Sequence, residues 1–240
     1  MHIGILRCGV LPDTASQKYG DMPDIITAAF HTIDPSIRFS VFDAIAEPLP
    51  SLDSCDAFLC TGSTSSSYDN TPWINNLQTM IRKCANSGKK VLGICFGHQV
   101  ILQALGGKVE PCERGWALGT AFNELHHQKQ GMQPPLQKMD ILAMHRDQVS
   151  QLPEGAELLA NSQFCPYFMV QFCSNILTIQ GHPEFTPDIM RNLMAVNIDN
   201  FPDHKIREAT ISIESQLDSY TVLQWMINFI NQRPAQTGGK

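Results

Sequence analysis

Apolar runs separated by polar stretches divide the first part of the chain into short alternating elements. The run Ala57–Cys60, for example, is continuous and bounded by turn residues, which is typical of a buried strand. Other stretches repeat their apolar residues at helical spacing. The pattern predicts strands at 3–8, 37–42, 57–60 and 90–94, and helices at 23–31, 77–85 and 97–105. This alternation favours a parallel sheet with helices on both faces.

The second part of the chain shows a different pattern, in which strands follow one another with few helices between them. It predicts strands at 119–125, 139–144, 157–160, 167–172 and 175–180, a helix at 187–196 with Thr186 as N-cap, and an amphipathic helix at 219–232. We therefore predict an α/β fold built on a doubly wound, mostly parallel sheet. Residues 116–170 would form a small antiparallel extension of that sheet.

Length and composition favour one domain. The chain has 240 residues, of which 43% are hydrophobic, and this is enough apolar material for one sizeable core. We expect a single domain over residues 1–233. The polar, glycine-containing end at 234–240 is expected to be a mobile tail.

Cys95 stands at the junction of the strand predicted at 90–94 and the helix that follows it, between Gly93 and Gly97. A sharp strand-to-helix turn strains the backbone, and glycines two residues to either side remove Cβ atoms that would clash. The first amides of the helix and its positive dipole end would stabilise a thiolate. The pattern therefore indicates a presented nucleophile. The other seven cysteines have no such setting and are expected in the core or on the surface.

His182 follows the strand predicted at 175–180 and stands two residues before Glu184, with Pro183 stiffening the turn between them. A thiol nucleophile needs an imidazole that takes its proton and gives it to the leaving group, and a third group that holds the imidazole in the right tautomer. The carboxylate of Glu184 is placed to accept the Nδ1 proton. The sequence thus supplies both partners for Cys95.

The Cys95 segment, Gly-Ile-Cys-Phe-Gly-His-Gln, and the later His-Pro-Glu together resemble the class I, triad-type glutamine amidotransferases. Other segments are similar to the branch that includes the amidotransferase domain of GMP synthase and the stand-alone γ-glutamyl peptidases. The resemblance covers about residues 40–190. It rests further on the segments at 60–69, 72–74, 106–109, 114–116 and 144–149. It implies a flavodoxin-like fold and hydrolysis of the γ-glutamyl amide of glutamine or of a γ-glutamyl compound.

The resemblance also implies roles for single residues. Cys95 would be the nucleophile, His182 the general base and acid, and Glu184 the residue that orients His182. The backbone amides of Gly62 and Phe96 would form the oxyanion hole. Substrate contacts would come from Gln99, Met144, His145 and Arg146. One position departs from the family pattern: Ser63 stands where many members carry a second glycine, so the oxyanion hole is either shaped differently or closes on substrate.

Composition limits the classes of partner that we expect the protein to bind. A net charge of −6 gives no basic surface for nucleic acid, and no apolar run approaches the ~18 residues that a membrane span needs. Irregular cysteine spacing and the lack of a hydrophobic signal segment favour a reducing, cytoplasmic location. No Cys-x2-Cys or His-x3-His spacing occurs, so we expect no metal site and no cofactor.

The sequence does not identify the molecule that accepts the released nitrogen. Because no phosphate-binding loop of the Gly-x4-Gly-Lys-Ser/Thr type is present, the chain is not expected to be a complete synthetase. It would be either a free-standing γ-glutamyl hydrolase or a glutaminase subunit that delivers ammonia to a separate synthase. A cysteine peptidase or chaperone on a related fold, and a non-catalytic binding or regulatory protein, are the remaining alternatives.

Overall fold

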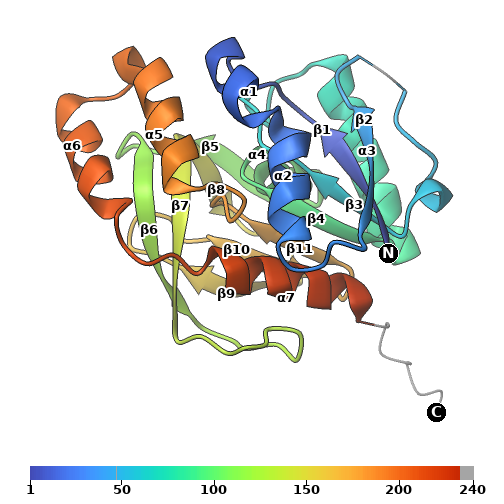
Figure 1. The fold of residues 1–240 in the computed structure, drawn as a ribbon. Helices are drawn as coiled ribbons and strands as arrows, with labels where there is room; N and C mark the ends of the chain where they lie inside the picture. Colours follow the sequence, from blue (N-terminus) through green and yellow to red (C-terminus); the bar gives the residue numbers. More distant parts are fainter. Residues whose placement is uncertain (47, 233–240) are drawn as a thin grey trace.

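The computed structural model describes residues 1–46 and 48–232. Within them, one sheet has nine strands in the order β2-β1-β3-β4-β11-β10-β9-β6-β7, and it extends across the molecule behind its front helices (Figure 1). Its first five strands pair in parallel. They are β2 (Arg38–Asp43), β1 (His2–Arg7), β3 (Ala57–Cys60), β4 (Lys90–Ile94) and β11 (Ile176–Ile179). The predicted parallel core is confirmed.

The other end of the sheet is antiparallel, as predicted from residues 116–170. Its strands are β10 (Met169–Phe172), β9 (Ala156–Asn161), β6 (Ala117–Leu125) and β7 (Lys138–His145). Two further strands that the sequence did not predict, β5 (Lys108–Pro111) and β8 (Asp147–Gln151), form a separate antiparallel pair.

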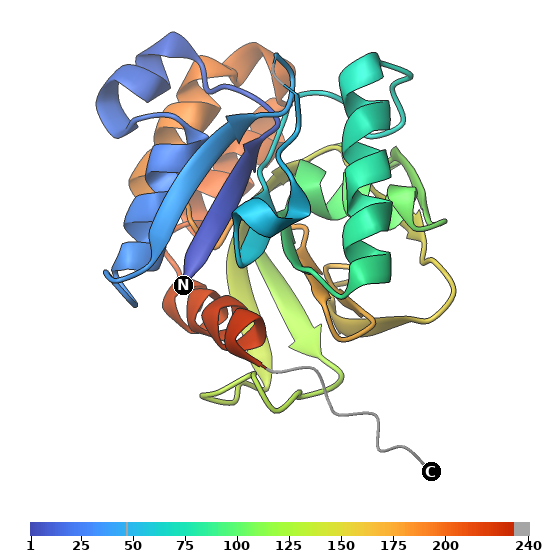
Figure 2. The same cartoon turned by 90° about the vertical axis from the view of Figure 1, so that its right-hand side faces the viewer.

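Helices cover both faces of the parallel strands (Figure 2). On one face lie α2 (Met22–His31) and α7 (Ser219–Asn231); on the other lie α3 (Pro72–Ser87) and α4 (Phe96–Ala104). The strands supply both cores by simple alternation, since successive side chains point to opposite faces. Leu59 and Leu92 pack with the α2 and α7 side, whereas Phe58 and Val91 pack with α3 and α4.

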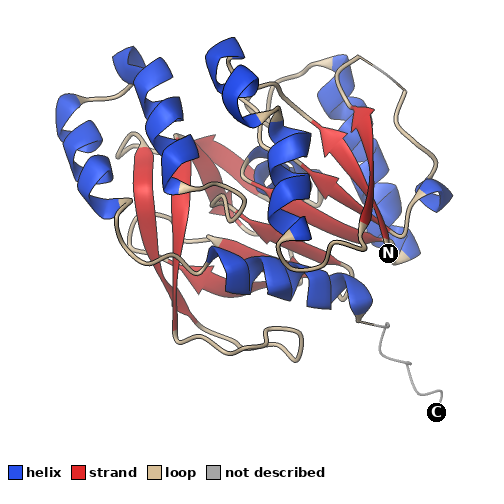
Figure 3. Cartoon of the chain, viewed as in Figure 1, coloured by secondary structure: helices blue, strands red, loops and turns tan. Residues whose placement is uncertain are grey.

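Figure 3 shows the helices and strands of the chain by colour, and several of the helix boundaries differ from the prediction. Helix α3 begins at Pro72, five residues before the predicted start at Leu77, so that 72–74 form its first turn. Helices α1 (Asp13–Tyr19) and α6 (Asp203–Ser212) were not predicted. Helix α5 (Pro187–Val196) has the predicted bounds, and the Thr186 hydroxyl accepts a hydrogen bond from the amide of Ile189. The predicted tail at 234–240 lies outside the described residues.

The carboxyl ends of the parallel strands share one edge of the sheet, which is where ligands bind in open α/β sheets. The loops after β3, β4 and β11 leave from this edge. Helices α1 and α5 lie side by side above it (Figure 1), and the Tyr19 hydroxyl donates to the carbonyl of Asp188 at 3.1 Å. Over the described residues, no helix combines the length and apolar character needed to cross a membrane.

Candidate active site

Cys95 occupies the one-residue junction between β4 and α4, with φ 55° and ψ −106°. A positive φ brings the Cβ of an L-residue close to its own backbone and costs roughly 1–2 kcal/mol. The conformation is held because the amide of Cys95 donates to the carbonyl of Ile179 on β11 and its carbonyl accepts from the amide of Gln99. The strained elbow predicted from the sequence is therefore present, and the Cys95 side chain projects from the strand-to-helix turn.

The two glycines beside Cys95 allow α4 to approach the sheet. A Cβ on Gly97 would lie 2.2 Å from the carbonyl oxygen of Cys60, and a Cβ on Gly93 would lie 2.6 Å from Ile101 Cδ1. The Gly97 amide donates to the carbonyl of Thr61 at 3.1 Å. Neither position has room for a side chain, so both glycines are required by close packing of helix on strand.

His182 leaves β11 at the same edge of the sheet, and its Nδ1 lies 2.7 Å from Glu184 Oε1. Because an ionised carboxylate can only accept, Nδ1 carries the proton and Nε2 is the free nitrogen of the neutral ring. Both residues are buried. The ring of Phe185 stacks on the imidazole, with centroids 4.1 Å apart and planes 3° from parallel. The imidazole is thus fixed in orientation and tautomer.

The electrostatics of His182 favour its charged form. Burial lowers the pKa of His182, but the charges of Glu184 and Cys95 and the hydrogen bonds to both outweigh burial and raise the pKa to about 10. Since Nδ1 is occupied by Glu184, the hydrogen bond to Cys95 runs through Nε2. A proton taken from the thiol is therefore stabilised on the imidazole.

Gly62, in the loop after β3, lies against both of these side chains. A Cβ built on Gly62 would be 3.2 Å from His182 Cε1 and 3.9 Å from Cys95 Cβ. Phe96 is the first residue of α4, a position whose amide has no acceptor within the helix. Ser63, the departure from the family pattern, turns its hydroxyl back to accept from the amide of Ser65 at 3.1 Å.

Asp147 accepts several hydrogen bonds beside this loop, and the sequence did not predict a role for it. Its Oδ2 accepts from the hydroxyls of Ser66 (2.6 Å) and Tyr68 (3.0 Å), and its backbone carbonyl accepts from Gln99 Nε2 (2.7 Å). The same carbonyl accepts from His145 Nδ1 at 3.1 Å. Asp147 therefore links the loop after β3 to α4 and to the end of β7.

The predicted substrate-binding residues occupy different settings. Both Nε2 hydrogens of Gln99 are directed inside the protein, to Asp147 and to Gln180 Oε1, which leaves its own carbonyl oxygen for any substrate contact. Burial lowers the pKa of His145 to about 4, so its ring is neutral at neutral pH. Arg146, by contrast, is largely exposed, with Nε 3.7 Å from Asp147 Oδ1.

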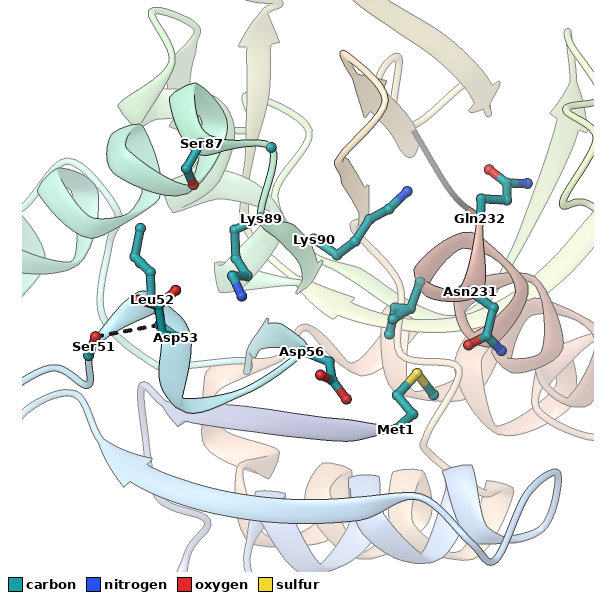
Figure 4. A pocket seen from close by; sticks show the side chains of 12 residues that line it. Met1, Ser51, Leu52, Asp53, Asp56, Ser87, Lys89, Lys90, Asn231 and Gln232 are labelled. Carbon is teal, nitrogen blue, oxygen red and sulfur yellow. Dashed lines mark hydrogen bonds between the residues drawn. The ribbon is translucent and has the colours of Figure 1, made fainter. Parts of the chain in front are cut away.

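A cavity of about 400 Å³ unites these features. Seven of the predicted site residues line it: Gly62, Cys95, Gln99, Met144, His145, Arg146 and His182. Phe96 and Glu184 do not line the cavity. Phe96 follows Cys95 directly in the chain, and Glu184 lies two residues after His182. A larger hollow of about 950 Å³ lies at the opposite edge of the sheet, beside Met1 and the start of β4 at Lys90 (Figure 4), and it contains no predicted site residue.

Over residues 1–46 and 48–232, no group of three or more His, Cys, Asp or Glu side chains is arranged to hold a metal ion.

Residues 39–198, more than half of the chain, match the glutamine amidotransferase class-I family. The chain belongs to the class I glutamine amidotransferases. The matched region begins in β2 and ends just after α5, so it contains the loop after β3, Cys95, His182 and Glu184.

Relatives of this amidotransferase include plant and yeast proteins. Over 163 residues it is 35% identical to gamma-glutamyl peptidase 4 of Arabidopsis thaliana, a match that covers 65% of this chain and 64% of that protein. It is 32% identical over 189 residues to a putative glutamine amidotransferase of Saccharomyces cerevisiae, covering 72% of this chain and 75% of the yeast protein. The chain thus spans slightly less than two thirds of the Arabidopsis relative's length.

The fold is also found in a crystal structure of a glutamine amidotransferase from Thermotoga maritima. The two superpose with a TM-score of 0.74 at 18% identity, and the match covers 96% of each chain. The predicted α/β fold with a mostly parallel core is confirmed by this similarity and by the sheet itself.

Proposed function

We propose that this amidotransferase hydrolyses the γ-glutamyl amide bond of glutamine or of a γ-glutamyl compound, with Cys95, His182 and Glu184 as its catalytic triad. One observation carries the proposal. The cavity brings together a strained cysteine, an imidazole hydrogen-bonded to a buried carboxylate, and Gly62, on which an added Cβ would lie within 4 Å of both reacting side chains. The relatives that are named gamma-glutamyl peptidases support the choice of bond.

The first half-reaction begins when the Cys95 thiol gives its proton to His182 Nε2. The thiolate attacks the δ-carbonyl carbon of the γ-glutamyl group, and the carbonyl oxygen becomes an oxyanion. The amides of Gly62 and Phe96 donate to that oxygen; in enzymes of this type, one lost donor typically costs about 10²- to 10³-fold in rate. The carbon–nitrogen bond then breaks, and the proton on His182 goes to the departing nitrogen, which leaves as ammonia or an amine.

The second half-reaction removes the γ-glutamyl group from Cys95. A water molecule gives a proton to His182 and attacks the thioester carbonyl, with the oxyanion held as before. The carbon–sulfur bond breaks, glutamate leaves, and Cys95 regains its proton from His182. Glu184 keeps the Nδ1 proton throughout and stabilises the imidazolium that each step creates. Every step uses side chains and amides of this chain and one water molecule.

Gln99, Met144, His145 and Arg146 would hold the glutamyl group, because they line the cavity beside Cys95. The acceptor of the nitrogen separates two versions of the function. A free-standing hydrolase needs only water, whereas a glutaminase subunit would pass ammonia to a separate synthase. Cytoplasmic location and the absence of nucleic-acid and membrane partners stay predictions from composition.

Product release from purified protein tests this proposal. Glutamine and a panel of γ-glutamyl dipeptides are incubated with the wild-type chain, Cys95→Ala and Cys8→Ala, and free amine, ammonia and glutamate are quantified. We expect glutamate release from at least one compound by wild type and Cys8→Ala, and none by Cys95→Ala. Cleavage that survives in Cys95→Ala contradicts the triad. A chain that cleaves nothing on the panel alone contradicts the free-standing version.

A further inference from the structure

The residues that line the cavity around Cys95 fall into two groups of different chemistry. The first supplies hydroxyl, amide and charged groups, from the loop after β3, from Gln99, and from Arg146 and Asp147. The γ-glutamyl group of every candidate substrate ends in an α-ammonium and an α-carboxylate. These charges require polar partners when they leave water. The glutamyl group therefore belongs beside these polar residues.

The rest of the lining, which we call the apolar wall, contacts His182 directly, because the Phe185 ring stacks on the imidazole with centroids 4.1 Å apart. The atom that leaves must receive its proton from His182, so the departing nitrogen and its substituent face His182. This part of the lining consists of large apolar side chains from the loop after β1, the start of α2, the residue before β6, and residues 185–201. Its members are Leu11, Met22, Trp116, Phe185, Leu193 and Phe201.

An aromatic pair belongs to this apolar wall. Trp116 and Phe201 meet edge to face, with ring centroids 5.0 Å apart and planes at 89°. Phe201 is buried and Trp116 is half-buried. Such a pair is fixed in geometry and can bury a large apolar surface at about 25 cal/mol for each Å² removed from water. Departing ammonia has no apolar surface to offer it.

The volume of the cavity also favours a substrate larger than glutamine. The cavity of about 400 Å³ falls within the 300–1,000 Å³ that is usual for drug-sized ligands. The neutral amides of Asn197 and Asn200, also in the lining, are the polar groups contributed by the segment that follows α5. The space next to the scissile nitrogen is thus large, apolar, and without a charged side chain from this segment.

We propose that this apolar wall is the subsite for the amine part of the substrate, an inference that rests on the proposed γ-glutamyl hydrolysis. The preferred substrates are then γ-glutamyl amides whose nitrogen carries an apolar or aromatic substituent, and glutamine is a poor substrate. Trp116 and Phe201 determine this specificity. The reaction that supplies such a substrate must join the γ-carboxyl of a glutamyl group to an apolar amine.

A comparison of kcat/KM across four compounds tests the inference: γ-glutamyl-phenylalanine, γ-glutamyl-leucine, γ-glutamyl-glycine and glutamine. We expect the phenylalanine and leucine compounds to exceed the glycine compound by about 10- to 100-fold, because added apolar groups in a fitted pocket are worth at least that much. Wild-type enzyme that cleaves the glycine compound or glutamine as well as the phenylalanine compound overturns the subsite and leaves the proposed function standing. Failure to cleave any of the four, with no γ-glutamyl adduct on Cys95, overturns both.

Two variants locate the preference. Phe201→Ala and Trp116→Ala should each lower the ratio of the phenylalanine to the glycine compound by about tenfold, through loss of buried apolar contact. Tyr220→Ala is the matched control, because Tyr220 is an aromatic residue on α7 that is 60% exposed and outside the cavity lining. The melting temperature of each variant is recorded. An unchanged ratio in a folded Phe201→Ala or Trp116→Ala protein contradicts the assignment.

Discussion

Among three buried histidines near the reaction cavity, two have a lowered pKa and one has a raised pKa. Burial lowers the pKa of His98 to about 3 and that of His145 to about 4, and neither has a carboxylate partner. His182 is equally buried, but Glu184 and Cys95 raise its pKa to about 10. At neutral pH the first two are therefore neutral, whereas the surroundings of His182 favour its charged form. The Glu184 carboxylate is the structural difference that matters most, because its charge is the first of the causes that raise this pKa.

Glu184→Gln should lower the pKa of His182. The amide keeps a hydrogen-bonding oxygen but removes the negative charge, so the pKa of His182 should fall by about 1–3 units. We also expect kcat/KM to fall on the order of 10²- to 10⁴-fold, since the imidazolium loses its stabilising charge. NMR titration of Cε1-labelled histidines measures the pKa directly.

The same titration contains its own controls, because His98 and His145 should not titrate between pH 5 and 8 in either protein. Linkage gives a second readout. A pKa raised in the folded state stabilises the protein fully below the unfolded value of 6.5, and that contribution is lost as pH rises through about 10. The stability difference between wild type and Glu184→Gln should therefore be largest below pH 6.5. A His182 midpoint that is the same in both proteins contradicts this account.

At the scale of elements, Asp147 connects parts of the fold that are far apart in sequence. It is the first residue of β8, and its side chain, only 12% exposed, receives the hydroxyls of Ser66 and Tyr68 from the loop between β3 and α3. Gly62 belongs to that same loop. We therefore expect the contacts of Asp147 with Ser66 and Tyr68 to help hold this loop in position.

Asp147→Ala should therefore impair the oxyanion hole without unfolding the protein. We expect the rate of Cys95 acylation to fall about tenfold or more, below the loss typical of a deleted oxyanion donor because the amides themselves remain. Tyr68→Phe, which removes one of the two hydroxyl donors and keeps the ring, should give a smaller loss. Rapid-quench measurement of acylation separates this effect from binding, and melting temperature reports on folding. Wild-type acylation in Asp147→Ala would mean that the loop is held in place by other contacts.

At the scale of the whole molecule, the parallel core was predictable because β1, β3, β4 and β11 are buried on both faces and appear as largely apolar runs. The elbow at Cys95 was predictable because close packing of α4 on the sheet permits only glycine at positions 93 and 97. Helices α1 and α6 were missed since each buries a single residue, Ala15 and Ala209 respectively, and so shows no apolar stripe. The start of α3 had a signal in Pro72, a residue favoured in the first turn of a helix.

The Asp147 contacts had no comparable sequence signal. They join side chains 79 to 81 positions apart, and they depend on how β8, α4 and the loop after β3 are placed by the assembled sheet. The apolar wall of the cavity is similar, because Trp116 stands between Cys95 and His182 in the chain whereas Phe201 lies beyond the matched region. Local patterns predict the reacting groups, whereas the surroundings that select a substrate arise from tertiary packing.

The central claim is that one of eight cysteines, Cys95, is acylated by a γ-glutamyl group. The most direct measurement is mass spectrometry of the intact protein and its peptides after reaction with a glutamine-mimicking diazoketone. The account predicts a single adduct, located on the peptide that contains Cys95, and no adduct in Cys95→Ala. An adduct that persists in Cys95→Ala, or that forms on another cysteine in wild type, would contradict it.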